Sequence, residues 1–242
     1  MGIFTRLRDA WFPPRCILCR EYLQPGAFLL LCPDCLRRLP LIPAKHCPVC
    51  GSVTPSGDGI CFSCHQHRPW YHKHSSVVFY TTEIRKMLLL FKFYHKRHYA
   101  PTLGILMSNY VSEDYDLITS VPISRERMAK RGYNQSELLA VQIGERCHIP
   151  YAAALQKQKN TLPQSKLNYK KRQINLNGSF AVVPEVNVKE KRILLIDDIY
   201  TTGATANECA KTLKKGGAAC VDVLTFASAD KKLTDALKEQ EV

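Results

Sequence analysis

The sequence predicts an α/β protein in which a mostly parallel sheet, flanked by helices, follows a small cysteine-rich region. Eight of the eleven cysteines lie between positions 16 and 64. Beyond them, apolar strand-like runs alternate with segments of helical spacing, and this alternation is typical of a parallel sheet covered by helices. The 242 residues are enough for one ordinary domain and one small domain.

A fall in cysteine density divides the chain into two regions. The stretch 66–75 is rich in histidine and contains Pro69, and it gives way to the β-branched and aromatic run 77–80. Such a run is typical of a strand, and here it would open a new domain. We therefore expect an N-terminal domain of residues 1–70 and a C-terminal domain of residues 71–242.

The C-terminal region alternates between two kinds of pattern. Helices are predicted where apolar residues recur every three or four positions, and strands where short apolar or β-branched runs occur. After the strand at 77–80, the expected elements are helical spacing over 84–106, a strand over 117–121, a helix over 136–146, strands over 178–183 and 193–196, a helix over 204–215 and a strand over 220–226. This order favours a mostly parallel sheet with helices packed on it.

The cysteines of the N-terminal region form four C-x-x-C pairs, separated by twelve, eleven and ten residues. The pairs are Cys16/Cys19, Cys32/Cys35, Cys47/Cys50 and Cys61/Cys64. Each pair can direct two thiolates at one metal ion, and two pairs supply the four sulfurs of a closed tetrahedral zinc site. The sequence therefore predicts a double zinc ribbon that holds two structural Zn²⁺ ions.

Other arrangements of these residues stay open at this point. A disulfide scaffold is disfavoured in a chain without a secretory signal, because cytoplasmic thiols stay reduced. Sequential pairing of the C-x-x-C motifs is simplest, but crossed pairing of the first and third motifs uses the same ligands. His46 and His65 lie next to ligand cysteines and can replace one. Because four sulfurs leave no open coordination position, we expect the ribbons to be architectural rather than catalytic.

The composition is strongly basic, with 34 Lys and Arg residues against 21 Asp and Glu residues and a net charge of +13. This surplus favours partners that carry phosphate, or anionic lipid head groups, without naming one. No apolar run is long enough to span a bilayer, and the first residues lack the apolar core of a secretory signal. We therefore expect a cytoplasmic protein.

Residues 192–205 combine a strongly apolar run, two consecutive acids and a turn rich in hydroxyl groups. Ligands of open α/β sheets bind beyond the carboxyl ends of the strands, where the next helix presents free N–H groups to an anion. Residues 201–205 can thus hold a phosphate, while Asp197 and Asp198 accept hydrogen bonds from ribose hydroxyls or order the water around Mg²⁺. Taken singly, two acids before a helix would only cap it and complement its dipole.

Over its whole length, this segment resembles the phosphoribosyl pyrophosphate (PRPP) motif of type I phosphoribosyltransferases. The resemblance implies a phosphoribosyltransferase-type sheet, catalytic roles for Asp197 and Asp198, and Mg²⁺ bound together with PRPP. It also implies that the 5-phosphate contacts Thr201, Thr202, Gly203, Ala204 and Thr205.

Residues 120–135 follow the predicted strand 117–121 with a run of basic side chains and one glycine. This stretch resembles the signature of the ComF family of bacterial DNA-uptake (competence) proteins. Together with the four C-x-x-C pairs and the PRPP-type segment, the likeness covers almost the whole chain. It implies that the pyrophosphate side of the ligand contacts Arg125, Arg127, Lys130, Arg131 and Gly132. Without a ligand, the same cations would simply be solvated.

Two further segments bear on this resemblance. A polar stretch matches the ComF pattern in the part that forms a hood over the ligand of related transferases, at Thr161, Gln164, Ser165, Leu167, Arg172, Asn175 and Phe180. After Lys92, residues 93–97 depart from the glycine and acid of many relatives. Their basic and aromatic mixture either follows a nucleic-acid backbone or ends an amphipathic helix, and the second is our expectation.

Three functions follow from these patterns. By resemblance, the first is a competence protein that binds or handles incoming single-stranded DNA, with the competence ATP-dependent helicase and the uptake machinery at the inner face of the plasma membrane as partners. Its pocket would hold PRPP or the 5′ end of DNA. The second is a magnesium-dependent phosphoribosyltransferase of nucleotide metabolism, whose acceptor the sequence does not indicate. The third is a sensor in which PRPP changes a partner surface.

Overall fold

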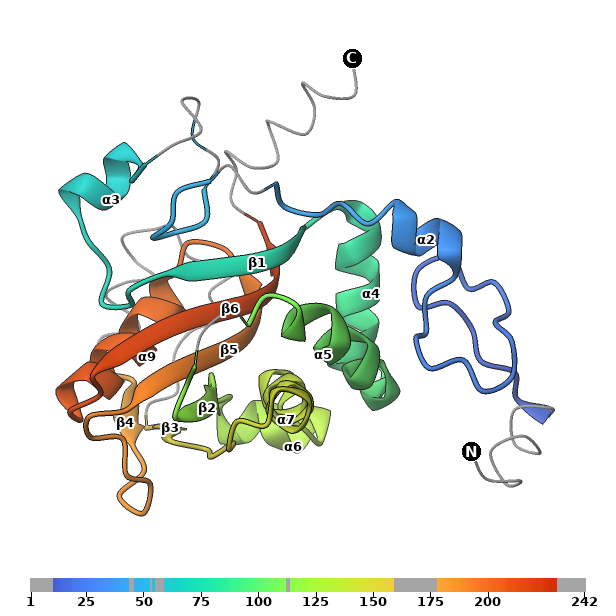
Figure 1. Ribbon diagram of the computed structural model, residues 1–242. Helices are drawn as coiled ribbons and strands as arrows, with labels where there is room; N and C mark the ends of the chain where they lie inside the picture. The colour runs from blue at the N-terminus through green and yellow to red at the C-terminus, as the bar shows by residue number, and fades with distance from the viewer. Residues whose placement is uncertain are drawn as a thin grey trace.

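Four parallel strands form the central sheet, in the order β1-β6-β5-β2 (Figure 1). The computed structural model describes residues 11–43, 46–52, 54, 59–111, 114–158 and 178–229. The strands are β1 (His74–Phe79), β2 (Leu117–Ser120), β5 (Arg192–Tyr200) and β6 (Cys220–Ser228). All neighbouring pairs run parallel, which confirms the predicted α/β class.

Strands β5 and β6 occupy the centre of the sheet and pair from Arg192 opposite Cys220 to Tyr200 opposite Ser228. Strand β6 is buried at every position after Cys220, and the first half of β5 is buried between Ile193 and Ile196. A sheet that is covered on both faces buries successive residues rather than alternate ones. This is why the sequence shows a continuous apolar run in β5.

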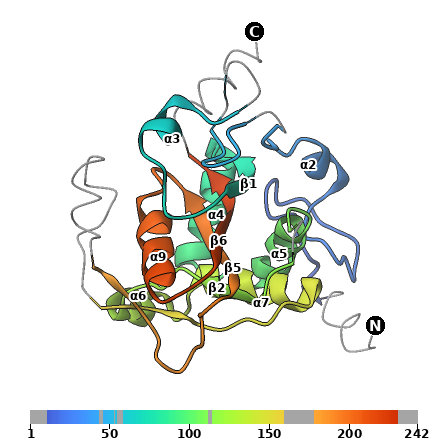
Figure 2. The ribbon, with the colours of Figure 1, turned by 60° about the vertical axis from the view of Figure 1, so that its left-hand side comes forward.

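Helices cover both faces of the sheet. Helices α4 (Thr82–Phe93), α5 (Ala100–Ser108) and α7 (Gln135–Cys147) contribute to one apolar core, whereas α9 (Ala204–Lys215) belongs to a second core on the opposite face. Figure 2 shows α9 on one side of the strands and α5 and α7 on the other. The helices predicted over 136–146 and 204–215 are thus confirmed.

The helical spacing expected over 84–106 is not one helix. Helix α4 begins after Thr81, whose side chain accepts a hydrogen bond from the N–H of Ile84, and it ends at Phe93. His95 then adopts a left-handed conformation with φ 53°, which an α-helix does not tolerate. The short helix η1 (Arg97–Tyr99) follows, and α5 starts directly after it. The apolar pattern persists because both helices face the same core.

Some elements leave no apolar pattern in the sequence. Helix α6 (Arg125–Arg131) buries none of its side chains, so no periodicity marks it. Strand β3 (Leu155–Lys157) pairs with β4 (Phe180–Val182) in a separate antiparallel sheet. The strand expected over 178–183 is therefore shorter than predicted and lies outside the parallel sheet.

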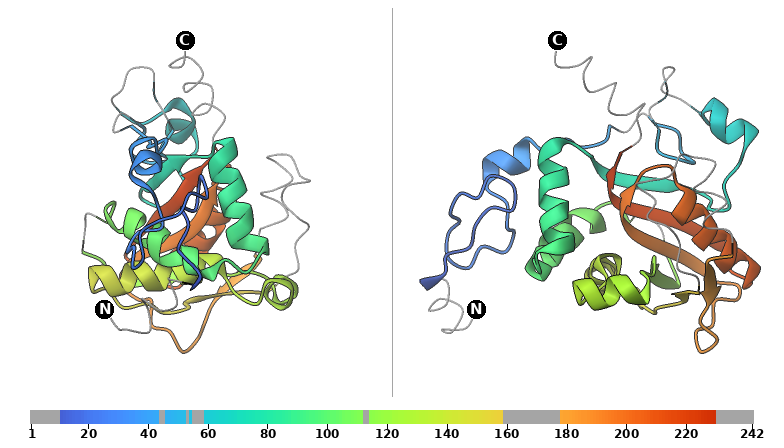
Figure 3. Two further views of the ribbon diagram at one scale, coloured as in Figure 1. Left: turned by 90° about the vertical axis from the view of Figure 1, so that its right-hand side faces the viewer. Right: turned by 180° about the vertical axis from the view of Figure 1, so that it is seen from behind.

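The cysteine-rich region flanks the sheet and contains two short helices, α2 (Pro33–Arg37) and α3 (Phe62–Gln66). Its first half packs beside α4 and α5, and its second half lies above β1 on the side of α9, as the two views of Figure 3 also show. The connection between the halves runs along the outer edge of β1: Leu41 bridges Val78, and the N–H of Ile42 donates to Val77 at 3.1 Å. A sheet edge that would otherwise be open is thereby paired.

The part of the chain that the structure describes contains no candidate membrane-spanning helix. None of the helices there combines the length and the apolar character needed to cross a bilayer.

Candidate functional site

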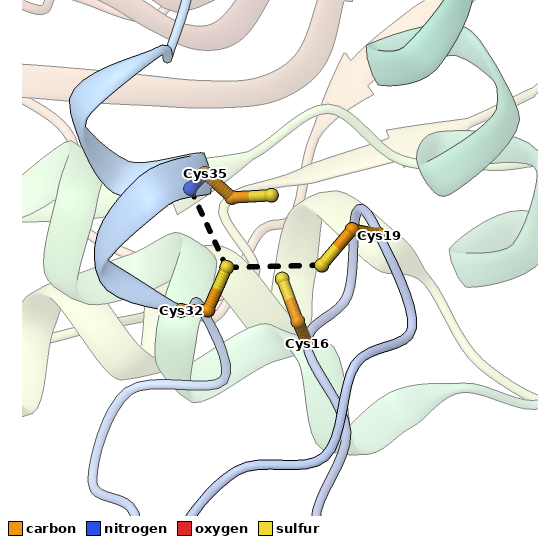
Figure 4. Close-up of side chains that lie close together, drawn as sticks. All are labelled: Cys16, Cys19, Cys32 and Cys35. Atoms are coloured by element: carbon orange, nitrogen blue, oxygen red, sulfur yellow. Dashed lines mark hydrogen bonds between the residues drawn. The ribbon is translucent and has the colours of Figure 1, made fainter.

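The first four cysteines meet in one cluster (Figure 4). Cys16 and Cys19 approach Cys32 and Cys35 at the start of α2, and the four Sγ atoms lie within 4.8 Å of one another. The Sγ atoms of Cys19 and Cys32 are 3.7 Å apart, and the backbone N–H of Cys35 donates to Cys32 Sγ at 3.4 Å. Four sulfurs at this spacing are the ligand set of a tetrahedral zinc ion.

The environment of this cluster fits a divalent cation. Burial opposes ionisation of Cys16, but hydrogen bonds from the backbone of Cys32, Cys19 and Leu18 outweigh it and lower the pKa of Cys16 to about 7. Burial and the neighbouring thiols raise the pKa of Cys35. A Zn²⁺ ion removes this conflict because its charge stabilises all the thiolates together.

The second cluster has the same form and contains Cys47, Cys50, Cys61 and Cys64, with all Sγ atoms within 4.8 Å of one another. The backbone N–H of Cys61 donates to Cys47 Sγ at 3.3 Å. Consecutive C-x-x-C pairs therefore share a site, which selects sequential pairing over the crossed arrangement. Neither cluster contains His46 or His65, and His46 Nδ1 hydrogen-bonds the carbonyl of Pro43 instead, at 2.8 Å.

A cleft of about 470 Å³ lies at the carboxyl ends of β2 and β5. Side chains from α4, α6, α7 and β3 form its walls, and the turn between β5 and α9 lies at one end. Its charged side chains are Lys92, Arg127, Arg131, Lys157, Asp197 and Asp198. Open α/β proteins bind their ligands at this edge of the sheet.

Asp197 is held in place by two hydrogen bonds. Ser136 Oγ donates to Asp197 Oδ1 at 2.8 Å, and the backbone N–H of Asp198 donates to the same oxygen at 2.9 Å. Burial, and next the negative charge of Asp198, raise the pKa of Asp197 to about 7. The carboxyl group can therefore hold or release a proton near neutral pH.

Asp198 has a different partner. Lys92, from the last turn of α4, places its Nζ atom 2.7 Å from Asp198 Oδ2, and both side chains are largely buried. A buried carboxylate needs such a compensating charge. The two neighbouring acids thus differ. Asp198 is ion-paired with Lys92, whereas Asp197 is neutralised in part by protonation near neutral pH.

The turn between β5 and α9 has the shape of an anion-binding loop. Gly203 precedes α9 with φ 71°, and a Cβ atom there would lie 2.3 Å from the hydroxyl oxygen of Tyr200, so glycine is required. Among the described residues no side chain caps α9, and the first N–H groups of a helix have no partner within it. Thr201 and Thr205 line the cleft beside this helix terminus. Phosphate oxygens suit such donors.

Part of the predicted basic set reaches the cleft. Arg127 and Arg131 line it, and so does Lys157 at the end of β3. Burial and the charge of Arg127 lower the pKa of Lys157. Because these cations crowd one another, an anionic ligand would relieve their repulsion.

The other members of that set lie outside the walls of the cleft. Arg125 and Lys130 are exposed on α6, where Lys130 pairs with Glu126 at 2.8 Å. Gly132 ends α6 with φ 72°, and its carbonyl accepts a hydrogen bond from Arg97 at 2.6 Å. Its backbone freedom is therefore used to terminate a helix. The pyrophosphate contacts expected of these residues stay predictions.

Tyr200 connects the loop to the second cysteine cluster. Its ring stacks on His74 with 3.8 Å between the centroids, and its hydroxyl hydrogen-bonds that of Tyr71 at 2.8 Å. His74 Nδ1 in turn hydrogen-bonds the carbonyl of Cys50 at 2.8 Å, and burial lowers the pKa of His74 to about 4, which leaves the ring neutral. A ligand cysteine, a buried imidazole and the loop thus form one chain of contacts.

Sequence reasoning missed several side chains of the cleft. Lys92 and Ser136 hold the two acids, and Lys157 adds a cation. A lysine in the last turn of an apolar helix was the available signal for Lys92, whereas nothing local marks Ser136 or Lys157. Of the hood residues, Phe180 lines the cleft. The others, Thr161, Gln164, Ser165, Leu167, Arg172 and Asn175, lie outside the described residues.

The donor set of the cleft fits PRPP with Mg²⁺. Paired carboxylates supply oxygen atoms for hydroxyl groups or for a hydrated Mg²⁺ ion. The loop at α9 suits a terminal phosphate, and Arg127, Arg131 and Lys157 suit a second phosphate group. In addition, Thr202 Oγ1 is buried without a hydrogen-bond partner. A sugar phosphate would bring both kinds of group together.

Similar proteins extend over almost the whole chain. The family model described as a double zinc ribbon domain matches residues 7–70. Competence protein F of Haemophilus influenzae is 31% identical over 229 residues, which cover 90% of this chain and 99% of that protein. Competence protein ComFC of Bacillus subtilis is 30% identical, and the match covers 87% of this chain and 93% of that protein. DNA utilization protein YhgH of Escherichia coli is 29% identical, and the match covers 87% of this chain and 95% of that protein.

Solved structures of phosphoribosyltransferases are among the structural neighbours. An adenine phosphoribosyltransferase from Thermoanaerobacter pseudethanolicus matches 56% of this chain and 83% of its own, with a TM-score of 0.38 and 14% identity. The allosteric regulatory enzyme of purine biosynthesis matches 57% of this chain but 29% of its own, with a TM-score of 0.41 and 20% identity. Scores this low carry no argument about activity.

Two sequential four-cysteine clusters and a parallel α/β body with a cleft at the strand ends define a double-zinc-ribbon protein with an α/β domain. The two competence proteins are at least 30% identical to it over nearly their full lengths. The chain therefore belongs to the ComF family of competence proteins.

Removal of zinc should unfold both ribbons and weaken the sheet domain. Ile17 and Leu31 of the first ribbon share a core with α4 and α5, and structural zinc contributes about 10–16 kcal/mol in small zinc peptides at pH 7. We expect two zinc ions per chain by atomic emission, about one after Cys16→Ser or Cys47→Ser, and a lower melting temperature by circular dichroism after chelation.

Cys147→Ser is the matched control for this experiment, since Cys147 is half-buried outside both clusters. Its zinc content should equal that of the unchanged protein. A melting temperature that does not respond to chelation would contradict the assignment of structural zinc.

The raised pKa of Asp197 makes stability depend on pH. Its folded-state pKa of about 7 lies above the ordinary 3.8, so its stabilising effect is complete below the ordinary value and is lost as the pH rises through about 7. Asp197→Asn keeps an oxygen acceptor but cannot ionise. As the pH rises from 3.8 to about 7, the free energy of unfolding of Asp197→Asn should therefore increase relative to that of the unchanged protein. The total increase should be a few kcal/mol, since one pKa unit corresponds to about 1.4 kcal/mol.

Urea denaturation of both proteins across this pH range measures the difference. Asp114→Asn replaces an exposed acid and should give a flat difference. A flat difference for Asp197→Asn as well would show that Asp197 ionises normally.

Proposed function

We propose that this protein binds single-stranded DNA as it is handled during uptake or utilisation, and that its cleft holds a 5-phosphoribose group, supplied by PRPP with Mg²⁺ or by the 5′ end of the strand. The observation that carries the proposal is the cleft itself, where paired acids face a cluster of cations beside an uncapped helix terminus. Relatives named as competence and DNA utilization proteins support a role in handling DNA.

The charge of the chain supports the DNA part of the proposal. The surplus of +13 gives an affinity for polyanions that falls with salt, because phosphate contacts release counterions. Such a protein would act in the cytoplasm at the inner face of the plasma membrane, with the competence helicase and uptake machinery as partners. We further propose that residues 1–70, which contain the ribbons, form one domain and that residues 71–242, which contain the sheet, form another.

Calorimetry with Mg²⁺-PRPP tests the cleft. The double variant Asp197→Asn/Asp198→Asn should lose at least about tenfold in affinity, since each lost charge-assisted contact is worth about 1.5–3 kcal/mol. Asp114→Asn is the exposed control and should bind like the unchanged protein. Retained PRPP affinity in the double variant would remove the pocket assignment.

Fluorescence anisotropy of a labelled single strand, against a matched duplex and over a salt series, tests the DNA part. We expect a preference for the single strand and a fall in affinity with salt of about 0.7 log units per log unit of salt for each phosphate contact. Competition by Mg²⁺-PRPP would place the 5′ end of the strand in the cleft, and its absence would make PRPP a separate ligand. No single-strand binding at moderate salt would refute this part.

The pKa of Asp197 favours a second candidate, a phosphoribosyltransferase. A carboxyl group with a pKa of about 7 can accept a proton from an incoming nitrogen nucleophile at neutral pH. If this holds, the protein releases pyrophosphate from Mg²⁺-PRPP when amines and nucleobases are supplied, and Asp197→Asn abolishes the release. Absence of release across such acceptors, with binding intact, would leave PRPP as a bound ligand.

A further inference from the structure

Arginine–aromatic pairs occur on the first ribbon and on the helices between it and the cleft. In the described ranges there are four of them, and they lie on the first ribbon, η1, the end of α4 and α6. The pairs are Arg15/Tyr22, Arg20/Tyr99, Arg97/Tyr133 and Arg131/Phe93. We call this set the arginine–aromatic surface.

The pairs differ in which partner faces the solvent. Tyr22 and Phe93 are 61% and 53% exposed, so their rings are accessible beside a guanidinium group. Arg15 lies 4.1 Å and Arg131 lies 4.6 Å from the respective ring centroid. Tyr99 and Tyr133 are buried instead. Arg97 lies 4.7 Å from the ring centroid of Tyr133, and Arg20 donates a hydrogen bond to the hydroxyl of Tyr99. The surface therefore presents both accessible rings and guanidinium groups.

Further exposed aromatic rings adjoin both ends of this set. Tyr94 follows Phe93 and is 64% exposed, and Trp11 and Phe12 precede Arg15 with more than three quarters of their area exposed. Large apolar side chains that gather on a surface without packing commonly mark an interaction site. The cations beside these rings favour a partner that carries negative charge.

The arginine–aromatic surface is continuous with the cleft. Arg131 lines the cleft, as does Lys92, the residue before Phe93. At the other end, Arg20 of the first ribbon hydrogen-bonds the hydroxyl of Tyr99 in η1. Figures 1 and 3 show this ribbon beside α4 and α5. A chain of contacts thus connects the cleft, through Arg131 and η1, to the first ribbon.

We propose that the arginine–aromatic surface is the track on which single-stranded DNA lies, with bases stacked on Phe93, Tyr94 and Tyr22 and phosphates held by the arginines between them. This inference rests on the single-strand binding proposed above and adds where the strand lies. Rings and guanidinium planes stack with every base, so binding without sequence preference follows. Duplex DNA keeps its bases stacked internally and cannot use the rings.

Substitution of the rings tests the track in the zinc-loaded full chain, with a labelled oligothymidine of about 20 nucleotides, longer than a typical site of about 4–16. Phe93→Ala/Tyr94→Ala and, separately, Tyr22→Ala should each weaken single-strand binding by about tenfold per ring. Their duplex affinity and the salt slope should stay the same. Phe62→Ala removes a ring that is 75% exposed on α3 of the other ribbon and should change nothing.

Photo-crosslinking gives a second readout that needs no variant. Oligothymidine with iodinated bases should crosslink to peptides that contain Tyr22, Phe93 or Tyr94, and not to the peptide that contains Phe62. Unchanged affinity in both ring variants, or crosslinks confined elsewhere while the protein binds single strands, would overturn the track and leave the proposed function intact. If the unchanged protein does not bind single strands, the proposed function fails and the track fails with it.

Discussion

The parallel pairing of β5 with β2 and β6 is the constraint on which the site depends. Because the strands run in one direction, their carboxyl ends meet at one edge, and Val121 after β2 lines the same cleft as Asp197 in β5. Each parallel connection also requires a crossover helix, so the loops before α7 and α9 are delivered to that edge as well. Ser136 at the start of α7 can therefore hold Asp197, although 61 positions separate them in sequence.

The zinc ribbons pack directly against the domain that contains the sheet. Cys16 and Ile17 lie in one core with α4 and α5, and Cys47 and Val49 lie in the other core with α9. A small ribbon has little apolar interior of its own and gains stability from such contacts as well as from metal. The stacking of Tyr200 on His74 then extends this support to the loop that precedes α9. Metal binding and the shape of the cleft are in this way linked by packing.

The sequence predicted those features that a local pattern records. Paired cysteines, apolar runs at 193–196 and 220–226, and the turn at Gly203 each have a physical signature within a few residues. The contributions of Lys92, Ser136 and Lys157 could not be predicted in this way, because tertiary contacts alone bring them to the acids. Helix α6 could not be predicted because it buries no side chain and therefore leaves no apolar periodicity in the basic run. His95 broke the expected long helix through its left-handed backbone, which composition does not reveal.

The charges of the cleft restrict the ligands that it can accept. Arg127, Arg131 and Lys157 attract an anion, whereas Asp197 and Asp198 repel it, and a neutral polyol carries no charge that would complement the three cations. A ligand satisfies both groups when its hydroxyls meet the carboxylates and its phosphates meet the cations and the N-terminus of α9. Burial, and next the negative charge of Asp198, raise the pKa of Asp197, and hydroxyl donors or Mg²⁺ would favour its ionised form. The electrostatic arrangement of the cleft therefore supports the proposal of a sugar-phosphate ligand, whether or not a transfer reaction follows binding.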